Sequence, residues 1–253
     1  MNKLKMALLA AGLSVGSAQA TIVEVQTTQG NFQINLFDER TPKTVENFLK
    51  YVENEDFNGV VYHRLVSDFV LQGGGYTFDG TAFNAIESYG TVVNEPVYSN
   101  VRGTIAMAKL ANDPNSATSQ WFINLSDNSA NLDLQNGGFT VFGQVIGDGM
   151  DVVDEMSKFA CNDYPLVNTT DEQCTDLKNG NLTLDAQRLI TIEHVAIIDS
   201  NTNTLGDLAP KENTLIKEPV QPPDNSNDSG GSFSALLTLL GGLLVFRRRR
   251  TTY

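Results

Sequence analysis

The chain of 253 residues contains little of what most metal, nucleotide and nucleic-acid sites require. It has only two histidines and two cysteines, so a metal centre built from these ligands is not expected. Its 17 basic residues stand against 30 acidic residues, and nucleic acid is not an expected partner because nucleic-acid binding relies on basic patches. No Gly-x-Ser-x-Gly motif is present, and no Gly-Lys-Ser/Thr follows the three glycines at 73–75.

The first twenty residues differ from the rest of the chain in charge and hydropathy. Lys3 and Lys5 precede an apolar stretch, and an Ala-Gln-Ala sequence ends at Ala20. This arrangement is typical of a secretory signal peptide cleaved before Thr21, and an ordinary N-terminal helix is the alternative. We therefore expect an exported chain in a compartment where disulfides persist.

The two cysteines, Cys161 and Cys174, lie in one polar stretch near the end of the predicted domain. Two cysteines allow one pairing, and an exported chain permits it. We expect a disulfide that closes a loop. The weaker alternatives are two free thiols, or a metal site that lacks its other ligands.

The C-terminal part of the chain divides into two segments. Residues 201–229 are rich in Asn, Asp, Pro and Thr and poor in aromatics, which predicts a disordered acidic linker exposed to solvent. Residues 230–253 hold a glycine pair, a short apolar run and four arginines at 247–250. As a helix the apolar run would span roughly 21 Å, less than the roughly 30 Å of a bilayer core. It could still insert, with the arginines on the cytoplasmic side.

Between these ends, residues 21–200 predict one domain with many short strands and few helices. Alternating or continuous apolar residues favour strands at 21–27, 31–37, 103–109, 120–124, 139–146 and 188–199. A helix is expected from Thr41 as N-cap and a second one at 148–159, with loops at 77–98 and 160–182. This pattern predicts a mainly β fold, a closed antiparallel β-barrel, and no βαβ units.

Residues 60–76 form the most informative stretch of the domain. They set one cation, Arg64, in an apolar run that continues through Phe69 and Gln72 to three glycines. A charge inside such a run needs either a partner or a function. Arg64 could be a structural cation paired with an acidic residue, or part of a site.

Four motifs together resemble one family. They are residues 60–76, Gly-Thr-Ile-Ala-Met-Ala at 103–108, Ser-Ala-Thr-Ser-Gln-Trp-Phe-Ile-Asn at 116–124 and Val-Phe-Gly at 141–143. In this order they resemble the cyclophilins, which are peptidyl-prolyl cis–trans isomerases, and the likeness to secreted bacterial members extends over residues 22–199. The resemblance implies an eight-stranded antiparallel barrel capped by two α-helices, with no metal and no cofactor.

The resemblance also implies a role for individual residues. Arg64 would be the catalytic donor, and Gln72 would orient it and hydrogen-bond the substrate backbone. Asn131 stands where many members have tryptophan, which implies weak cyclosporin binding. The implied substrate-binding residues are Phe69, Val70, Ala108, Gln120, Phe122, Leu132 and Phe139. Three of them, Phe69, Phe122 and Leu132, could instead be ordinary core residues.

The implied activity is isomerisation of X–Pro bonds in proline-containing polypeptides by a monomeric enzyme of the periplasm or cell envelope of a Gram-negative bacterium. A chaperone that binds peptides in the same groove without turnover is the alternative. A membrane-tethered assembly factor is a third possibility. The tail at 230–253 resembles Gly-Gly sorting tails that insert transiently and are then removed by a rhomboid-type protease. A permanent anchor is the other interpretation.

Overall fold

The computed structural model describes residues 21–200 and 208–216. The predicted signal peptide at 1–20 and the predicted sorting tail at 230–253 lie outside these residues, so both stay predictions. Within the described ranges no helix is long and apolar enough to span a membrane.

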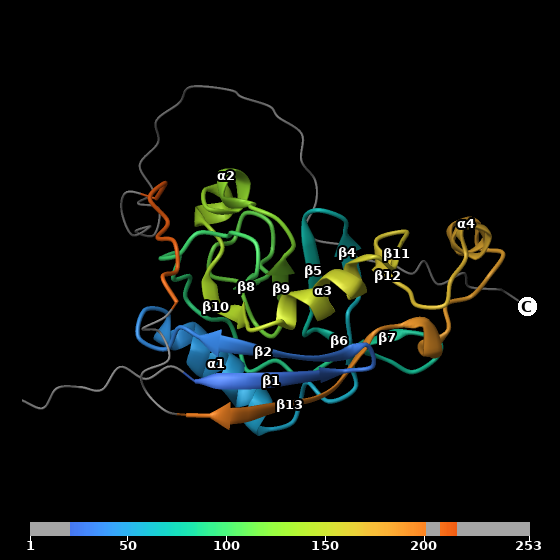
Figure 1. Cartoon of the computed structure of the whole chain (residues 1–253), viewed down its shortest axis with the longest axis horizontal. Coiled ribbons are helices and arrows are strands. Elements are labelled where there is room, and N and C mark those ends of the chain that lie inside the picture. Colours follow the sequence, from blue (N-terminus) through green and yellow to red (C-terminus); the bar gives the residue numbers. More distant parts are fainter. Residues whose placement is uncertain (1–20, 201–207, 217–253) are drawn as a thin grey trace, which may run out of the picture.

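Most of the described strands belong to one antiparallel sheet (Figure 1). Its hydrogen-bonded order is β4-β5-β9-β8-β10-β2-β1-β13-β3-β6-β7. The eleven strands are β1 (Ile22–Thr27), β2 (Gly30–Leu36), β3 (Val60–Val61), β4 (Arg64–Val66), β5 (Val70–Gly73), β6 (Tyr76–Phe78), β7 (Phe83–Ala85), β8 (Thr104–Met107), β9 (Trp121–Asn124), β10 (Val141–Ile146) and β13 (Thr191–Asp199). A separate two-stranded hairpin consists of β11 (Ala160–Cys161) and β12 (Tyr164–Pro165).

The helices are short and stand around the sheet. The α-helices are α1 (Pro42–Glu53), α2 (Ser129–Leu132), α3 (Gly149–Ser157) and α4 (Asp171–Asn179), and the two 3₁₀ turns are η1 (Gln135–Gly137) and η2 (Ala186–Arg188). The two predicted helices are confirmed as α1 and α3. Helix α3 packs against β2 and β10, and α1 contacts β13.

The sheet is strongly curled. Strands β3 and β4 stand far apart in the hydrogen-bonded order, yet only Tyr62 and His63 separate them along the chain. The edge that carries β4 therefore returns to the neighbourhood of β3. The mainly β class and the antiparallel pairing are confirmed. The hydrogen-bonded order is an open series, and the closed eight-stranded barrel stays a prediction.

The strands that continue as unbroken apolar runs are covered on both faces. Successive side chains of a strand point to opposite faces, and the buried residues divide accordingly. Leu71, Ile105 and Trp121 belong to the large core cluster, whereas their neighbours Val70 and Phe122 belong to a second cluster on the other face. The absence of alternation in these strands thus follows from two-sided burial.

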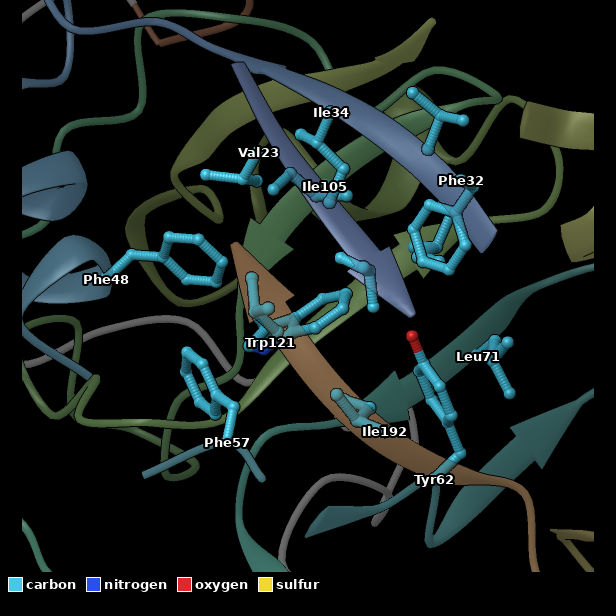
Figure 2. Close-up of a cluster of buried hydrophobic side chains, with 14 of the residues drawn as sticks. Val23, Phe32, Ile34, Phe48, Phe57, Tyr62, Leu71, Ile105, Trp121 and Ile192 are labelled. Carbon is cyan, nitrogen blue, oxygen red and sulfur yellow. The ribbon is translucent and has the colours of Figure 1, made fainter. Parts of the chain in front are cut away.

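The large core lies between the curled sheet and α1 (Figure 2). Trp121 is fully buried, and Phe48 of α1 meets its ring edge-on with ring centroids 6.0 Å apart. Phe57 and Tyr62 approach the same indole at 6.4 Å and 5.9 Å. The buried face of α1, which includes Val45, Phe48 and Val52, therefore faces this aromatic centre.

Three loop or linker predictions need correction. Residues 77–98 contain most of β6 and all of β7, and residues 160–182 contain β11, β12 and α4. Helix α4 was not recognisable from an apolar stripe because it buries none of its residues. Residues 208–216 were predicted to be solvated linker, but they hydrogen-bond to the domain at Val97 and Ser99. The polar composition of residues 208–216 did not predict this attachment, because the contacts are largely backbone hydrogen bonds.

The predicted disulfide is confirmed, since Cys161 and Cys174 are bonded to each other. The bond joins the β11–β12 hairpin to α4. That hairpin packs beside β4, the strand that begins with Arg64.

The N-terminus of α1 is capped from a distant part of the chain. Thr41 occupies the N-cap position, as predicted, but its side chain makes no capping hydrogen bond. The Glu95 carboxylate instead accepts from the backbone N–H and the hydroxyl of Thr44, at 2.9 Å and 2.8 Å. A carboxylate at this position also complements the positive end of the helix dipole.

We therefore expect Glu95→Ala to lower the free energy of unfolding by about 1–2 kcal/mol, because two buried donors lose their acceptor. Urea unfolding of the purified chain measures this change. The matched control is Glu46→Ala, which removes an exposed carboxylate from the same helix and should change stability by less than about 0.5 kcal/mol. Equal effects of the two substitutions would contradict the capping role.

Candidate active site

Four neighbouring strands, β4, β5, β9 and β8, bring the predicted site residues together. In the β4–β5 pair, Arg64 stands directly opposite Gln72, and in the β5–β9 pair Gln72 stands opposite Phe122. In the β8–β9 pair, Ala106 stands opposite Phe122. Residues from positions 64 to 122 thus lie across one short stretch of sheet.

A chain of polar side chains runs along this stretch. Arg64 Nη1 lies 3.5 Å from Gln72 Oε1, and Gln72 Nε2 donates to Gln120 Oε1 at 2.9 Å. Gln120 Nε2 in turn lies 3.5 Å from the hydroxyl of Tyr76. Gln72 is almost fully buried, whereas Arg64 and Gln120 are half-buried. The two amides hold one another and leave the guanidinium partly accessible.

An apolar cluster adjoins the polar chain. Phe122 and Phe139 are buried and meet edge-to-face at 5.8 Å, and Phe69 is half-buried at the margin. All of the predicted apolar site residues belong to this cluster, namely Phe69, Val70, Ala108, Phe122, Leu132 and Phe139. Four of them line a small apolar depression: Phe69, Val70, Phe122 and Leu132. The structure therefore unites residues that the sequence spreads over more than seventy positions.

The electrostatics of the site are set by burial. Burial lowers the pKa of Arg64, and the nearby Asp163 carboxylate opposes that shift. Asp163 lies in the β11–β12 hairpin, and its carbonyl accepts from Leu65 N at 2.6 Å. The hairpin with the disulfide thus places a counter-charge beside the guanidinium. An arginine remains charged at any ordinary pH.

His63 is a structural neighbour of the site. Burial lowers its pKa to about 4, and the charge of Arg64 contributes in the same direction. Its ring packs edge-on against Tyr76 at 4.9 Å. His63 is therefore neutral at neutral pH.

The glycines after Gln72 allow the amides to approach the strand. A Cβ on Gly75 would lie 2.5 Å from Gln120 Cγ, and one on Gly74 would lie 2.6 Å from the carbonyl oxygen of Ser119. Gly74 also has φ +79°, a region that L-residues rarely adopt. The glycine run thus serves close packing, as the absence of a phosphate-loop motif had indicated.

Sequence reasoning missed the contacts of Lys109. Its side chain is buried, and Nζ donates to the carbonyl oxygens of Asn136 and Gly138 at 2.9 Å and 2.6 Å. The same ammonium lies 4.7 Å from the ring centre of Phe139. Burial lowers the pKa of Lys109 to about 8. The only sequence signal was a lysine directly after the apolar run of β8.

A larger hollow, of about 940 Å³, lies between α1 and residues 89–93. It is open, and charged side chains of α1 line much of it, among them Lys43, Glu46 and Lys50. None of the predicted site residues reaches it. Among the described residues no group of His, Cys, Asp and Glu is arranged to hold a metal ion.

The lowered pKa of His63 gives a pH dependence of stability. The unfolded chain takes up a proton near pH 6.5, whereas the native chain does so only near pH 4. The stability that comes from a neutral, buried His63 is therefore fully present above pH 6.5, and it is lost as the pH falls toward 4. We expect His63→Phe to flatten the pH dependence of the unfolding free energy by up to about 1.4 kcal/mol per pH unit between these values. Urea unfolding across this pH range measures the effect. If the lowered pKa is not that of His63, the plots of unfolding free energy against pH for the wild type and His63→Phe will be parallel.

Comparison with known proteins identifies the family. Residues 22–176 match the family described as cyclophilin type peptidyl-prolyl cis-trans isomerase/CLD. The chain is similar to a peptidyl-prolyl cis-trans isomerase of Acinetobacter baylyi, with 39% identity over 166 residues that cover 63% of this chain and 85% of that relative. It is also similar to peptidyl-prolyl cis-trans isomerase B of Escherichia coli, with 38% identity over 143 residues that cover 55% and 85%.

The fold agrees with this match. A cyclophilin type peptidyl-prolyl cis-trans isomerase of Cryptosporidium parvum superposes with a TM-score of 0.51 at 21% identity, covering 71% of this chain and 98% of that one. The matched region contains the polar chain, the apolar cluster and the disulfide. The chain belongs to the cyclophilin-type peptidyl-prolyl cis–trans isomerases.

Proposed function

We propose that this isomerase acts on X–Pro bonds of exported polypeptides, with Arg64 as the catalytic donor. The observation that carries the assignment is the position of Arg64, directly opposite Gln72 and close to the only small apolar depression that predicted site residues line in the described part of the chain. A cation beside an apolar pocket suits a substrate with an apolar ring and a polar amide.

The reaction needs no covalent step. Resonance gives the peptide bond a rotational barrier of about 18–20 kcal/mol, and uncatalysed X–Pro isomerisation takes roughly tens to hundreds of seconds. A catalyst need only bind the twisted amide more tightly than either planar form. In the twisted state the proline nitrogen loses conjugation and gains a lone pair.

Arg64 would donate a hydrogen bond toward that lone pair. Its guanidinium is always charged and has several donors. It would lose little conformational freedom when substrate binds, because Gln72 Oε1 already faces Nη1. Gln72 is held in turn by Gln120 at 2.9 Å. The polar chain would thus orient the donor before substrate arrives, and Gln72 would also hydrogen-bond the substrate backbone.

The apolar cluster would hold the proline ring. Phe69, Val70, Phe122 and Leu132 line the depression, while Phe139 packs behind Phe122. Ala108 and Gln120 would flank the residues that precede the proline. The contacts between these side chains and the proline ring do not change as the amide rotates. They should therefore affect substrate affinity more than turnover.

Arg64→Ala should lower kcat/KM for a short proline peptide by about 100-fold or more, because the only proposed donor to the twisted amide is lost. A spectroscopic cis–trans assay measures the rate, and calorimetry with the same peptide measures binding. The control is Lys158→Ala, which removes an exposed cation that pairs with Glu155 at the end of α3. Full activity of Arg64→Ala would refute the assignment, and a wild type without acceleration would favour the peptide-binding chaperone.

Gly75→Ala tests the placement of Gln120. The new Cβ would collide with Gln120 Cγ, so the bond to Gln72 should break and kcat/KM should fall by about tenfold. Gly80→Ala is the comparison for backbone strain without a collision, since a Cβ at that glycine would have no atom within 4 Å although its φ is +95°. Thermal unfolding of both variants separates a local effect from loss of fold. Unchanged activity of Gly75→Ala would argue against the polar chain.

We further propose that the chain is exported to the periplasm or cell envelope of a Gram-negative bacterium and that its C-terminal tail is a sorting signal. The support is the charge and hydropathy pattern of residues 1–20 and 230–253. The tail would insert transiently into the membrane and would then be cleaved.

The intact mass of the protein purified from its native cells tests both ends. We expect a chain that begins at Thr21 and ends near Gly231, because the signal and the tail would both be removed. A mass that includes Met1 would contradict export through a cleaved signal. A mass that extends to Tyr253 would instead support a permanent membrane anchor.

A further inference from the structure

Residues 208–216 form an extended segment that lies against the domain beyond the region matched by the family (Figure 1). Its backbone pairs with residues 97–99: Ser99 N donates to the carbonyl of Lys211 and Asn213 N donates to the carbonyl of Val97, both at 2.8 Å. An antiparallel bridge joins Tyr98 and Glu212 between these bonds. We call residues 208–216 the strap.

The strap also contacts the loop that runs from the end of α2 to β10. Asn213 Nδ2 donates to the carbonyl oxygen of Asp133 at 3.0 Å. Ile216 lies against Gly138, since a Cβ on that glycine would be 2.6 Å from Ile216 Cδ1. Both ends of the loop 133–138 are therefore touched by strap side chains.

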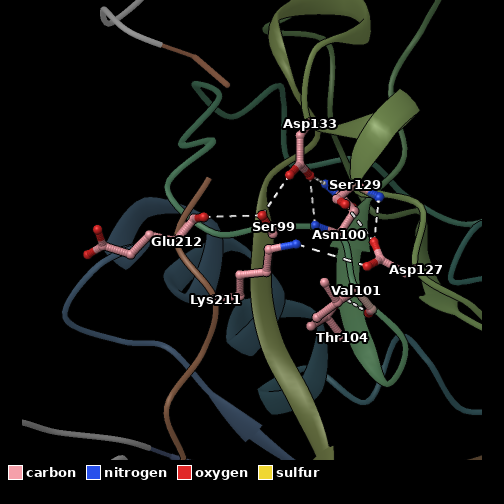
Figure 3. A network of polar contacts seen from close by, with 9 residues as sticks. All are labelled: Ser99, Asn100, Val101, Thr104, Asp127, Ser129, Asp133, Lys211 and Glu212. Carbon is pink, nitrogen blue, oxygen red and sulfur yellow. Dashed lines mark hydrogen bonds and ion pairs between the residues drawn. The ribbon is translucent and has the colours of Figure 1, made fainter. Parts of the chain in front are cut away.

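Asp133 ties the same loop to the residues that pair with the strap (Figure 3). Its buried carboxylate accepts from Asn100 N and Ser99 Oγ, each at 2.7 Å, and from Asn100 Nδ2 at 3.0 Å. Ser99 Oγ also lies 3.2 Å from the carbonyl oxygen of Glu212. The strap, residues 99–100 and Asp133 thus form one polar network.

The loop matters because its two neighbours belong to the apolar cluster of the site. Asp133 directly follows Leu132, and Gly138 directly precedes Phe139. Phe139 N donates to the carbonyl of Leu132 at 2.9 Å, so the two residues are held side by side. Groups of the domain also hold the loop: Lys109 Nζ bonds to two of its carbonyls, Asn94 Nδ2 donates to the carbonyls of Gly137 and Gly138, and the Asp133 carboxylate bonds to residues 99–100. The strap adds a support at each end of the loop, through Asn213 and Ile216.

We propose that the strap is a positioning element for the proline pocket: it fixes residues 133–138 and so sets the places of Leu132 and Phe139. This inference rests on the proposed function of those residues. The strap touches neither Arg64 nor Gln72 in any described contact. It should therefore affect how tightly the pocket binds the proline ring and leave the catalytic donor in place. Its two ion pairs, Arg40–Glu212 at 3.5 Å and Lys211–Asp127 at 4.0 Å, are exposed and should add little.

The test replaces residues 208–216 of the full chain by a Gly-Ser sequence of equal length. The same replacement at 221–229 is the matched control, which keeps the strap and the length of the tail. Initial rates at increasing concentrations of a proline peptide give KM and kcat separately. We expect KM to rise by about fivefold with kcat within twofold of wild type for the strap replacement, and no change for the control.

Point variants keep the proposal testable if the replaced chain folds poorly. Asn213→Ala combined with Ile216→Gly should raise KM in the same way, whereas Lys211→Ala should not. A synthetic peptide of residues 208–216 added in excess should lower the KM of the strap replacement toward the wild-type value.

An unchanged KM in the strap replacement or in the double variant would overturn the proposal. So would a fall in kcat with KM unchanged, since that is the effect of losing folded protein. Arg64→Ala measured in the same assay tests the catalytic assignment separately, so a failure of the strap proposal can be told from a failure of that assignment.

Discussion

The register of β5 between β4 and β9 is the constraint on which the site depends. It sets Gln72 opposite Arg64 on one side and opposite Phe122 on the other. A slip of one residue would turn Gln72 into the core and bring Leu71 to the site, because side chains alternate between the two faces. The aromatic core around Trp121 fixes this register, since Leu71 and Trp121 must face inward together.

The same arrangement explains how an apolar site can hold a cation. The guanidinium of Arg64 is half-buried, and Asp163 from the disulfide hairpin offsets part of the cost. The two glutamines satisfy each other and face the guanidinium without neutralising it. The result is a fixed positive donor beside an apolar surface, which is the combination that a twisted prolyl amide requires.

The local motifs of the sequence predicted most of this. The apolar runs predicted many of the strands, helices were expected from Thr41 onward and at 148–159, and a resemblance spread over four motifs predicted which residues meet. The unpredicted features share a physical cause, which is that they depend on partners far away in sequence. Glu95 caps α1 across some fifty positions, as its bonds to Thr44 show, and Lys109 reaches the carbonyl of Gly138.

The strap at 208–216 was missed for a related reason. Its composition is that of a solvated linker, and its attachment uses backbone groups, the side-chain amide of Asn213 and one isoleucine, which leave no periodic signal. Helix α4 has only two apolar residues packed against the domain, Cys174 and Leu177, which is too few for an apolar stripe, and a capping box from Thr170 to Gln173 marks its start in the sequence. The composition of a segment thus predicts how the segment behaves in isolation. It does not reveal the hydrogen-bonding groups that the domain presents to it.

The central claim is that the polar chain across β4, β5 and β9 acts as one unit. A double-mutant cycle in kcat/KM with Gln72→Ala, Gln120→Ala and the double variant tests it most directly. If the two amides work through each other to orient Arg64, the double variant should lose little more activity than the more damaging single variant, with a coupling of about 1 kcal/mol or more. Losses that simply add in free energy would contradict a single unit and leave the two glutamines as independent contacts.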